Sequence, residues 1–191
     1  MYYYFDRKIE ENGISIDKEE YDPKPFNKLG ISIKEMDTTY NIYFKKLKKT
    51  VYQDILYADT NFIISDKLKN TFVKNLIELD NIEYYSTNLI DLKTKAVENR
   101  CYWIANILNN VDCVDFKKSE IEYYPGTDVI KNIQKLVFNE TMILGRDIFR
   151  AQTKGRTMKI FVSEKLKTIL EQEKITGYKL TPLSEYKEEK Y

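Results

Sequence analysis

Two stretches of the chain repeat one pattern, a short apolar strand followed directly by the start of a helix. One reads N-F-I-I-S-D-K-L-K-N-T-F from Asn61, and the other reads K-I-F-V-S-E-K-L-K-T-I-L from Lys159. Three apolar β-formers predict a buried strand, and Ser65 or Ser163 then predicts a helix N-cap, because a serine hydroxyl accepts from the first free amides. An internal repeat is favoured over chance, although serine followed by an acidic residue is common at helix starts.

Each copy predicts a helix with one apolar stripe and then a second strand. An extended piece follows each helix, at residues 82–85 in the first copy and 178–180 in the second, and Gly177 is available as a left-handed helix C-cap. The stripe residues expected to face the core are Leu68, Phe72 and Leu76 in the first copy and Leu166, Ile169 and Leu170 in the second.

Most of the remaining chain predicts strands, so the expected fold is a single α+β domain over residues 1–191. We expect a mixed, mostly antiparallel sheet with a few helices, and two strand-helix-strand units related by the repeat. Residues 1–53 are the least legible part. A helix remains an alternative for the segment around Trp103, but the turn-prone pair that follows it favours a strand. The additional predicted strands are residues 2–5, 31–33, 102–111, 114–116, 133–138, 141–144 and 147–150.

Composition argues against several classes of function. The chain of 191 residues has 31 basic and 30 acidic side chains, so no strong net charge attracts nucleic acid or an anionic membrane. It contains no histidine, which removes the usual general base for a serine or cysteine nucleophile. We expect a cytoplasmic protein without a membrane span, in which Cys101 and Cys113 stay reduced and packed.

The segment from Tyr102 to Ser119 couples an apolar run to a few regularly placed polar groups. Asp112 and Asp115 are candidates for metal binding or acid-base chemistry, which leaves a carboxylate- or metal-dependent hydrolase as an alternative function. The segment lacks the ligand number and the glycine bend of a calcium loop, so a structural role for the pair is favoured. Asn106 lies on a predicted buried strand and should be hydrogen-bonded. Trp103 is a candidate partner anchor, although a core position is favoured.

Three of the five arginines, Arg146, Arg150 and Arg156, fall within eleven residues, near Lys154 and Gly155. They predict a local patch for an anion or an acidic partner. A small nucleic-acid-binding module is a further alternative, but no stacking motif accompanies the patch, so nucleic acid is an unfavoured partner.

A set of spaced motifs gives the chain a recognisable signature. Y-W-x-x-N begins at Tyr102, V-D-C-V-D begins at Val111, F-V-S begins at Phe161 and T-G-Y-K-L-T-P begins at Thr176. This signature resembles a family of bacterial immunity proteins that are encoded beside polymorphic toxins. The resemblance is best over residues 99–183, with a weaker echo back to residue 54.

The resemblance implies an α+β protein of the cytosol, without enzymatic activity or cofactor, that binds a cognate toxin domain and blocks it. Sixteen tyrosines suit such a role, because they supply rigid amphipathic contact area. In the adjacent pairs Tyr84–Tyr85 and Tyr123–Tyr124, one member should face outward if the backbone is extended. The oligomeric state stays open. The candidate partner-binding residues are Trp103, Asp112, Asp115, Tyr123, Tyr124, Arg146 and Arg150. The candidate structural residues are Ser65, Asn106, Ser119, Ser163, Gly177 and Pro182.

Overall fold

The computed structural model describes residues 1–8, 13–16, 32, 39–47, 49–58, 61–153 and 156–189. The strand predicted at residues 31–33 lies mostly outside these ranges. The strands are β1 (Tyr2–Arg7), β2 (Ser15–Ile16), β3 (Tyr40–Lys45), β4 (Ile55–Ala58), β5 (Asn61–Ser65), β6 (Ile82–Asp91), β7 (Tyr102–Ile107), β8 (Asn110–Val111), β9 (Glu120–Tyr123), β10 (Ile130–Lys135), β11 (Ile148–Thr153), β12 (Arg156–Ser163), β13 (Tyr178–Pro182) and β14 (Glu188–Glu189). The α-helices are α1 (Asp66–Lys74) and α2 (Glu164–Gln172), and the 3-10 helices are η2 (Leu79–Asn81), η3 (Glu140–Met142) and η4 (Leu183–Glu185).

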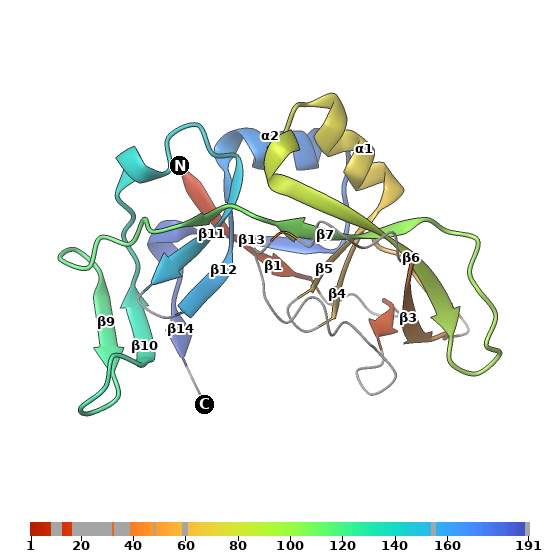
Figure 1. The fold of residues 1–191 in the computed structure, drawn as a ribbon, viewed down its shortest axis with the longest axis horizontal. Helices are drawn as coiled ribbons and strands as arrows, with labels where there is room; N and C mark the ends of the chain where they lie inside the picture. Colours follow the sequence, from red (N-terminus) through yellow and green to blue (C-terminus); the bar gives the residue numbers. More distant parts are fainter. Residues whose placement is uncertain are drawn as a thin grey trace.

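The described strands form three sheets. The largest has the order β2-β3-β6-β7-β5-β4, the second has the order β13-β1-β12-β11-β8, and the third has the order β14-β10-β9. Of the pairings between these strands, β3 with β6 and β8 with β11 are parallel and the others are antiparallel. Figure 1 shows α1 and α2 together on one side of the two larger sheets, with the three-stranded sheet at one end of the molecule. The predicted α+β class with mostly antiparallel sheets is confirmed.

Serine caps start both α-helices, as the repeat predicted. The Ser65 hydroxyl accepts from the backbone N–H of Leu68 at 3.2 Å, and the Ser163 hydroxyl accepts from that of Leu166 at 3.1 Å. Each serine hydroxyl also donates to an aspartate. Ser65 donates to Asp54, just before β4, at 2.8 Å, and Ser163 donates to Asp147, just before β11, at 2.7 Å. The hydroxyl of each cap is thus satisfied as donor and as acceptor, which fixes its orientation.

The two helices also end alike. The second residue after each helix is left-handed, with φ of 54° at Leu76 and 49° at Lys174. The next amide bonds back into the helix, from Ile77 to the Phe72 carbonyl and from Ile175 to the Leu170 carbonyl, both at 2.9 Å. This is the Schellman arrangement, which satisfies the last carbonyls. The prediction that Gly177 caps α2 was therefore wrong, because Lys174 takes that conformation three residues earlier.

The surrounding topology is shared by the two strand-helix-strand segments. β7 lies antiparallel between β5 and β6, and β1 lies antiparallel between β12 and β13. The strand between the two strands of the first segment is β7, which follows that segment in the chain. The strand between the two strands of the second segment is β1, the N-terminal strand of the chain. The internal repeat itself stays a prediction.

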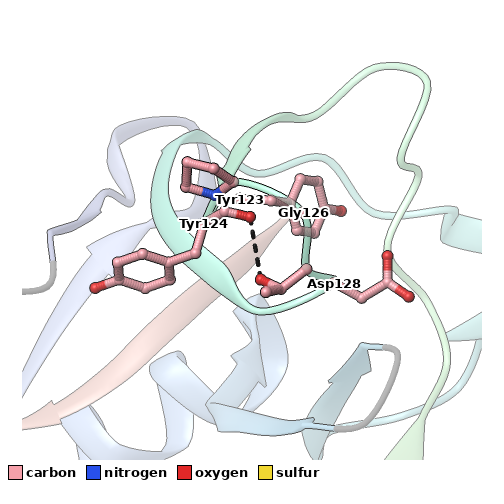
Figure 2. A pocket seen from close by; sticks show the side chains of 6 residues that line it. Tyr123, Tyr124, Gly126 and Asp128 are labelled. Carbon is pink, nitrogen blue, oxygen red and sulfur yellow. Dashed lines mark hydrogen bonds between the residues drawn. The ribbon is translucent and has the colours of Figure 1, made fainter.

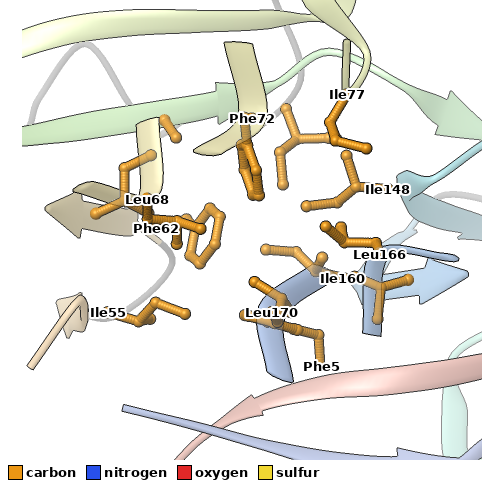
Figure 3. Close-up of a cluster of buried hydrophobic side chains, with 14 of the residues drawn as sticks. Phe5, Ile55, Phe62, Leu68, Phe72, Ile77, Ile148, Ile160, Leu166 and Leu170 are labelled. Atoms are coloured by element: carbon orange, nitrogen blue, oxygen red, sulfur yellow. The ribbon is translucent and has the colours of Figure 1, made fainter. Parts of the chain in front are cut away.

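One apolar cluster is lined by both large sheets and both helices, and we call it the shared cluster (Figure 3). Leu68 and Phe72 enter it from α1, and Leu166 and Leu170 enter it from α2, each with 0% exposure. The prediction for Leu76 was wrong: it is 72% exposed, because α1 ends at Lys74 and the left-handed turn directs Leu76 outward. Further members of the shared cluster are Tyr3, Phe5, Ile55, Phe62, Ile64, Ile77, Ile82, Ala105, Ile107, Ile148, Ile160, Val162 and Ile175.

Three other strand predictions need correction. The strand predicted over residues 102–111 breaks after Ile107, at the expected turn-prone pair, and the helical alternative is excluded there. Residues 114–116 hold only a bridge from Val114 to Phe138 and then turn, because Asp115 accepts the amides that follow it. Residues 141–144 are not extended, because the Asn139 side chain caps η3.

Gly177 is needed for a close approach of two chain segments. Its φ is +91°, and a Cβ atom there would lie 2.5 Å from the Ile55 carbonyl oxygen. A backbone hydrogen bond joins the same segments, from the Ile55 amide to the Thr176 carbonyl at 3.2 Å, and a second one ties the end of β1 to this turn, from the Lys8 amide to the Gly177 carbonyl at 3.1 Å. The glycine thus lets the turn before β13 contact the start of β4.

Replacement of either cap serine by alanine should lower the free energy of unfolding by about 1 to 2 kcal/mol, because the helix loses its cap and the aspartate loses a donor. Urea-induced unfolding of Ser65→Ala and Ser163→Ala measures this loss. Ser184→Ala, at an exposed serine of η4, is the matched control and should change stability by less than about 0.5 kcal/mol. Equal effects at all three serines would contradict the role of the caps.

Gly177→Ala should destabilise the chain by about 2 to 5 kcal/mol, because left-handed strain and a backbone clash add together. Gly126→Ala separates the two causes, since φ there is +71° but an added Cβ meets nothing within 4 Å. That control should show strain alone, about 1 to 2 kcal/mol. Similar unfolding midpoints for the two variants in urea would rule out the clash.

Candidate protein-binding surface

Two loops, at residues 112–119 and 137–145, are joined side by side. The Asp115 amide donates to the Val137 carbonyl at 2.9 Å, and the Asn139 amide donates to the Cys113 carbonyl at 2.7 Å. The Ser119 hydroxyl accepts from the Val137 amide at 2.9 Å and lies 3.2 Å from its carbonyl. Ser119 therefore joins the two loops through its hydroxyl, and its structural role stays a prediction. We call these two loops the loop pair.

Asp115 shapes the first of these loops. Its carboxylate accepts from the amides of Lys117 and Lys118 at 3.1 and 3.3 Å and forms an ion pair with the Lys118 ammonium at 3.2 Å. Burial raises the pKa of Asp115, but these donors together outweigh it and hold the pKa below its usual value. Asp112 is exposed. Within the described residues no group of three or more His, Cys, Asp or Glu side chains has metal-binding geometry.

A shallow depression of about 440 Å³ opens in the surface of the loop pair. Phe116 and Met142 lie beside it, with 42% and 52% of their surface exposed. Leu144, two residues beyond Met142, is 85% exposed. The residues that line the depression are Asp112, Val114, Asp115, Phe116, Lys117, Asn139 and Met142. Large apolar side chains are thus presented to solvent beside two carboxylates.

The β9–β10 hairpin rises directly from the loop pair and carries two tyrosines at its tip. Tyr123 and Tyr124 are 40% and 41% exposed. Figure 2 shows their rings directed apart at the turn, where the Thr127 hydroxyl donates to the Tyr124 carbonyl at 3.1 Å. The alternation was predicted, but both rings are exposed, because the tip has no covering layer among the described residues.

Tyr84 and Tyr85 differ from the second tyrosine pair. Tyr84 packs against the shared cluster, and Tyr85 is buried in the cluster on the opposite face of β6. Burial raises the pKa of Tyr84. The prediction of an outward ring was wrong here, because both faces of this sheet are covered.

Trp103 is partly buried and already has partners. Its indole N–H donates to Asp66 at 3.0 Å, and the Lys69 ammonium lies 3.1 Å from its ring centroid. Burial lowers the pKa of Lys69, and Asp66 opposes that shift. Trp103 therefore fastens α1 to β7, and its use as a partner anchor stays a prediction. Asn106 on the same strand donates to Glu83 at 3.3 Å and is 4% exposed.

Arg146 lies at a polar junction between the two halves of the chain. Its guanidinium donates to Asn109 at 2.9 Å and lies 3.5 Å from Glu78, a carboxylate only 8% exposed. Glu78 also accepts from the amide of Asp147 at 3.0 Å and from Asn109 at 2.7 Å. The charge of Arg146 thus offsets a buried carboxylate and joins the segment before β6 to the segment before β11.

The predicted arginine patch is not assembled in the described structure. Arg150 is 5% exposed on β11, so it offers no surface to an anion, and that prediction was wrong. Its strand is covered on both faces, which a sequence window does not reveal. Lys154, Gly155 and the side chain of Arg156 lie outside the described part. Pro182 ends β13, opposite Tyr3 of β1. Because β13 is at the edge of its sheet, the missing N–H of the proline breaks no hydrogen bond to a further strand.

A family model described as Immunity protein family (Imm11) matches residues 4–185, nearly the whole chain. The chain belongs to this immunity protein family. Membership implies neutralisation of a cognate toxin by a protein that is typically non-enzymatic. A search of curated proteins found no match. The described helices of the immunity protein include none long and apolar enough to cross a membrane.

The exposed apolar residues of the loop pair were missed by sequence reasoning. Phe116 and Met142 fell inside predicted strands, where an apolar residue normally faces a core. The signals for turns were present, since Asp115 and Asn139 are both residues whose side chains accept local amides. Asn139 accepts from the Thr141 amide at 3.3 Å.

The two cysteines of the immunity protein should differ in reactivity. Both are free thiols, but Cys101 is exposed, contrary to the expected packing, and Cys113 is buried. Burial raises the pKa of Cys113 to about 12, so its thiolate is scarce at neutral pH. Ellman's reagent should label one thiol in the native protein and the second only in denaturant. In Cys101→Ser the native signal should vanish, and rapid native labelling of that variant would contradict the burial of Cys113.

Proposed function

We propose that this immunity protein neutralises its cognate toxin by binding the toxin domain and occluding its working surface. The observation that carries the proposal is the family match over residues 4–185. We further propose that it acts in the cytoplasm, as a single domain over residues 1–191. The specific toxin is defined by the neighbouring gene, since immunity proteins of the resembled kind are encoded beside their toxins.

We propose that the contact surface is the hairpin end, defined as residues 112–145. Large apolar side chains are exposed there, and tight protein interfaces use such aromatic and methionine anchors. A standard interface buries about 800 Å² on each partner, so we expect more of the hairpin end than its two tyrosines to contact the toxin. The exposed large apolar residues of the hairpin end are Phe116, Tyr123, Tyr124, Val129, Met142 and Leu144.

The geometry favours occlusion because the hairpin end is a firm support. Phe138, in the second loop of the loop pair, packs against Phe149 at 5.8 Å and Phe161 at 4.9 Å between ring centroids. The Tyr2 hydroxyl donates to the Ile143 carbonyl at 2.9 Å. The loops are thus held to the five-stranded sheet before any partner arrives, which lowers the entropy lost on binding.

Trp103 and Arg146 are secondary candidates for contact. Both are partly exposed, but each satisfies a buried or half-buried carboxylate of the immunity protein itself. A partner that used either residue would have to leave that carboxylate paired. They therefore rank below the hairpin end.

Co-expression with the protein encoded immediately beside this chain tests the proposed function. Cells that express the neighbour alone should stop growing, and cells that also express the immunity protein should grow. A harmless neighbour, or a neighbour that kills in the presence of the intact immunity protein, would overturn the proposal.

The same assay tests the contact surface. The double variant Tyr123→Ala, Tyr124→Ala should protect less than the wild type, because it removes two aromatic contacts without disturbing the core. Val97→Ala, at a residue 59% exposed between β6 and β7 and outside the hairpin end, is the control and should protect fully. Full protection by the tyrosine variant, at unchanged expression and unfolding temperature, would exclude the tip from the interface.

A further inference from the structure

The depression of the loop pair has the composition of an anchor site. Three of its lining residues are apolar, Val114, Phe116 and Met142, and its volume of about 440 Å³ is enough for one or two large side chains. Phe116 gives a rigid aromatic face, and Met142 gives an adaptable thioether that fits partners of irregular shape. A monomer gains nothing by holding such side chains in water.

The frame of the depression is fixed by hydrogen bonds from both of its loops. Asn139 accepts from the amide and the hydroxyl of Thr141, and the Met142 amide donates back to the Asn139 carbonyl at 3.1 Å. Asp115 holds the opposite loop through two amides. Because these carboxylate and amide groups are used within the loops, they set the shape of the depression and are not its recognition groups.

The charge left for recognition is that of Asp112. It is exposed, lines the depression and forms no ion pair within the described residues. The other carboxylate, Asp115, is neutralised by Lys118 at 3.2 Å. Lys117 also lines the depression, but its long, flexible side chain can turn the ammonium group into solvent. The short side chain of Asp112 therefore places a negative charge beside the apolar lining residues.

We propose that this depression receives an apolar anchor side chain of the toxin, flanked by a lysine or arginine that meets Asp112. The inference rests on the proposed function and names one contact within it. Hot spots in protein interfaces commonly combine a buried apolar anchor with surrounding polar or charged groups. The charge of Asp112 would favour a basic partner and speed its association, while contact with the apolar lining residues would slow its dissociation.

Binding of the purified neighbouring toxin domain to purified variants of the full chain tests the proposal. Phe116→Ala and Met142→Ala should each weaken binding at least tenfold, mainly through faster dissociation. Asp112→Asn should slow association severalfold and flatten its dependence on salt, because a screened attraction is lost. Val73→Ala and Asp80→Lys, at exposed positions on α1 and η2, are matched controls that should bind as the wild type does.

A charge exchange identifies the flanking residue. Asp112→Lys should weaken binding at least tenfold, and one Lys→Glu or Arg→Glu variant of the toxin domain should restore most of that loss. Restoration by one such variant, and by no other, supports the assignment. Absence of restoration across all surface Lys and Arg variants of the toxin would overturn the basic flank.

Failure of this inference can be told apart from failure of the proposed function. If the wild type binds the toxin domain and Phe116→Ala, Met142→Ala and Asp112→Asn bind equally well, with unfolding temperatures unchanged, the depression is not an anchor site although neutralisation stands. If the wild type does not bind the toxin domain at all, the proposed function falls and this inference falls with it.

Discussion

Burial of α1 and α2 against the shared cluster is the interaction on which the rest of the structure depends. Each helix has only nine residues, below the roughly 12 to 15 at which an isolated helix becomes even marginally stable in water. Leu68, Phe72, Leu166 and Leu170 supply the missing stability by leaving water completely. Because both large sheets line the same cluster, the helices also hold those sheets to each other.

Polar groups complete that junction with direction that apolar contacts lack. Asp54 and Asp147 each orient a cap serine and attract a lysine of the helix, at 3.7 Å for Lys67 and 2.6 Å for Lys165. Glu78 and Arg146 then tie the segment after α1 to the segment before β11. Sequence reasoning assigned Arg146 to a partner, but in the structure it pairs with Glu78. Leaving that buried carboxylate unpaired would destabilise the fold strongly.

The proposed binding surface lies where this architecture ends. The three-stranded sheet carries the hairpin away from the shared cluster, and a second aromatic cluster around Phe149 and Phe161 supports its base. Exposed apolar groups at that end suit the proposed contact with a toxin, because apolar patches of this kind often mark protein interaction sites. Shape, a rigid support and a few aromatic anchors are the properties that such a task requires.

The sequence by itself determined the elements whose causes are local. An apolar triplet followed by serine specified each strand, cap and helix start, and the spaced motifs from Tyr102 to Pro182 specified the family. The tertiary structure alone decided which side chains are covered, because burial depends on residues far away in the chain. Arg150 became buried and Leu76 exposed for that reason, and Gly177 is required by the Ile55 carbonyl more than a hundred positions away. The hairpin end became a candidate surface for the same reason. Phe116 and Met142 are residue types that usually lie in a core, and only the tertiary packing of the loop pair leaves them exposed to solvent.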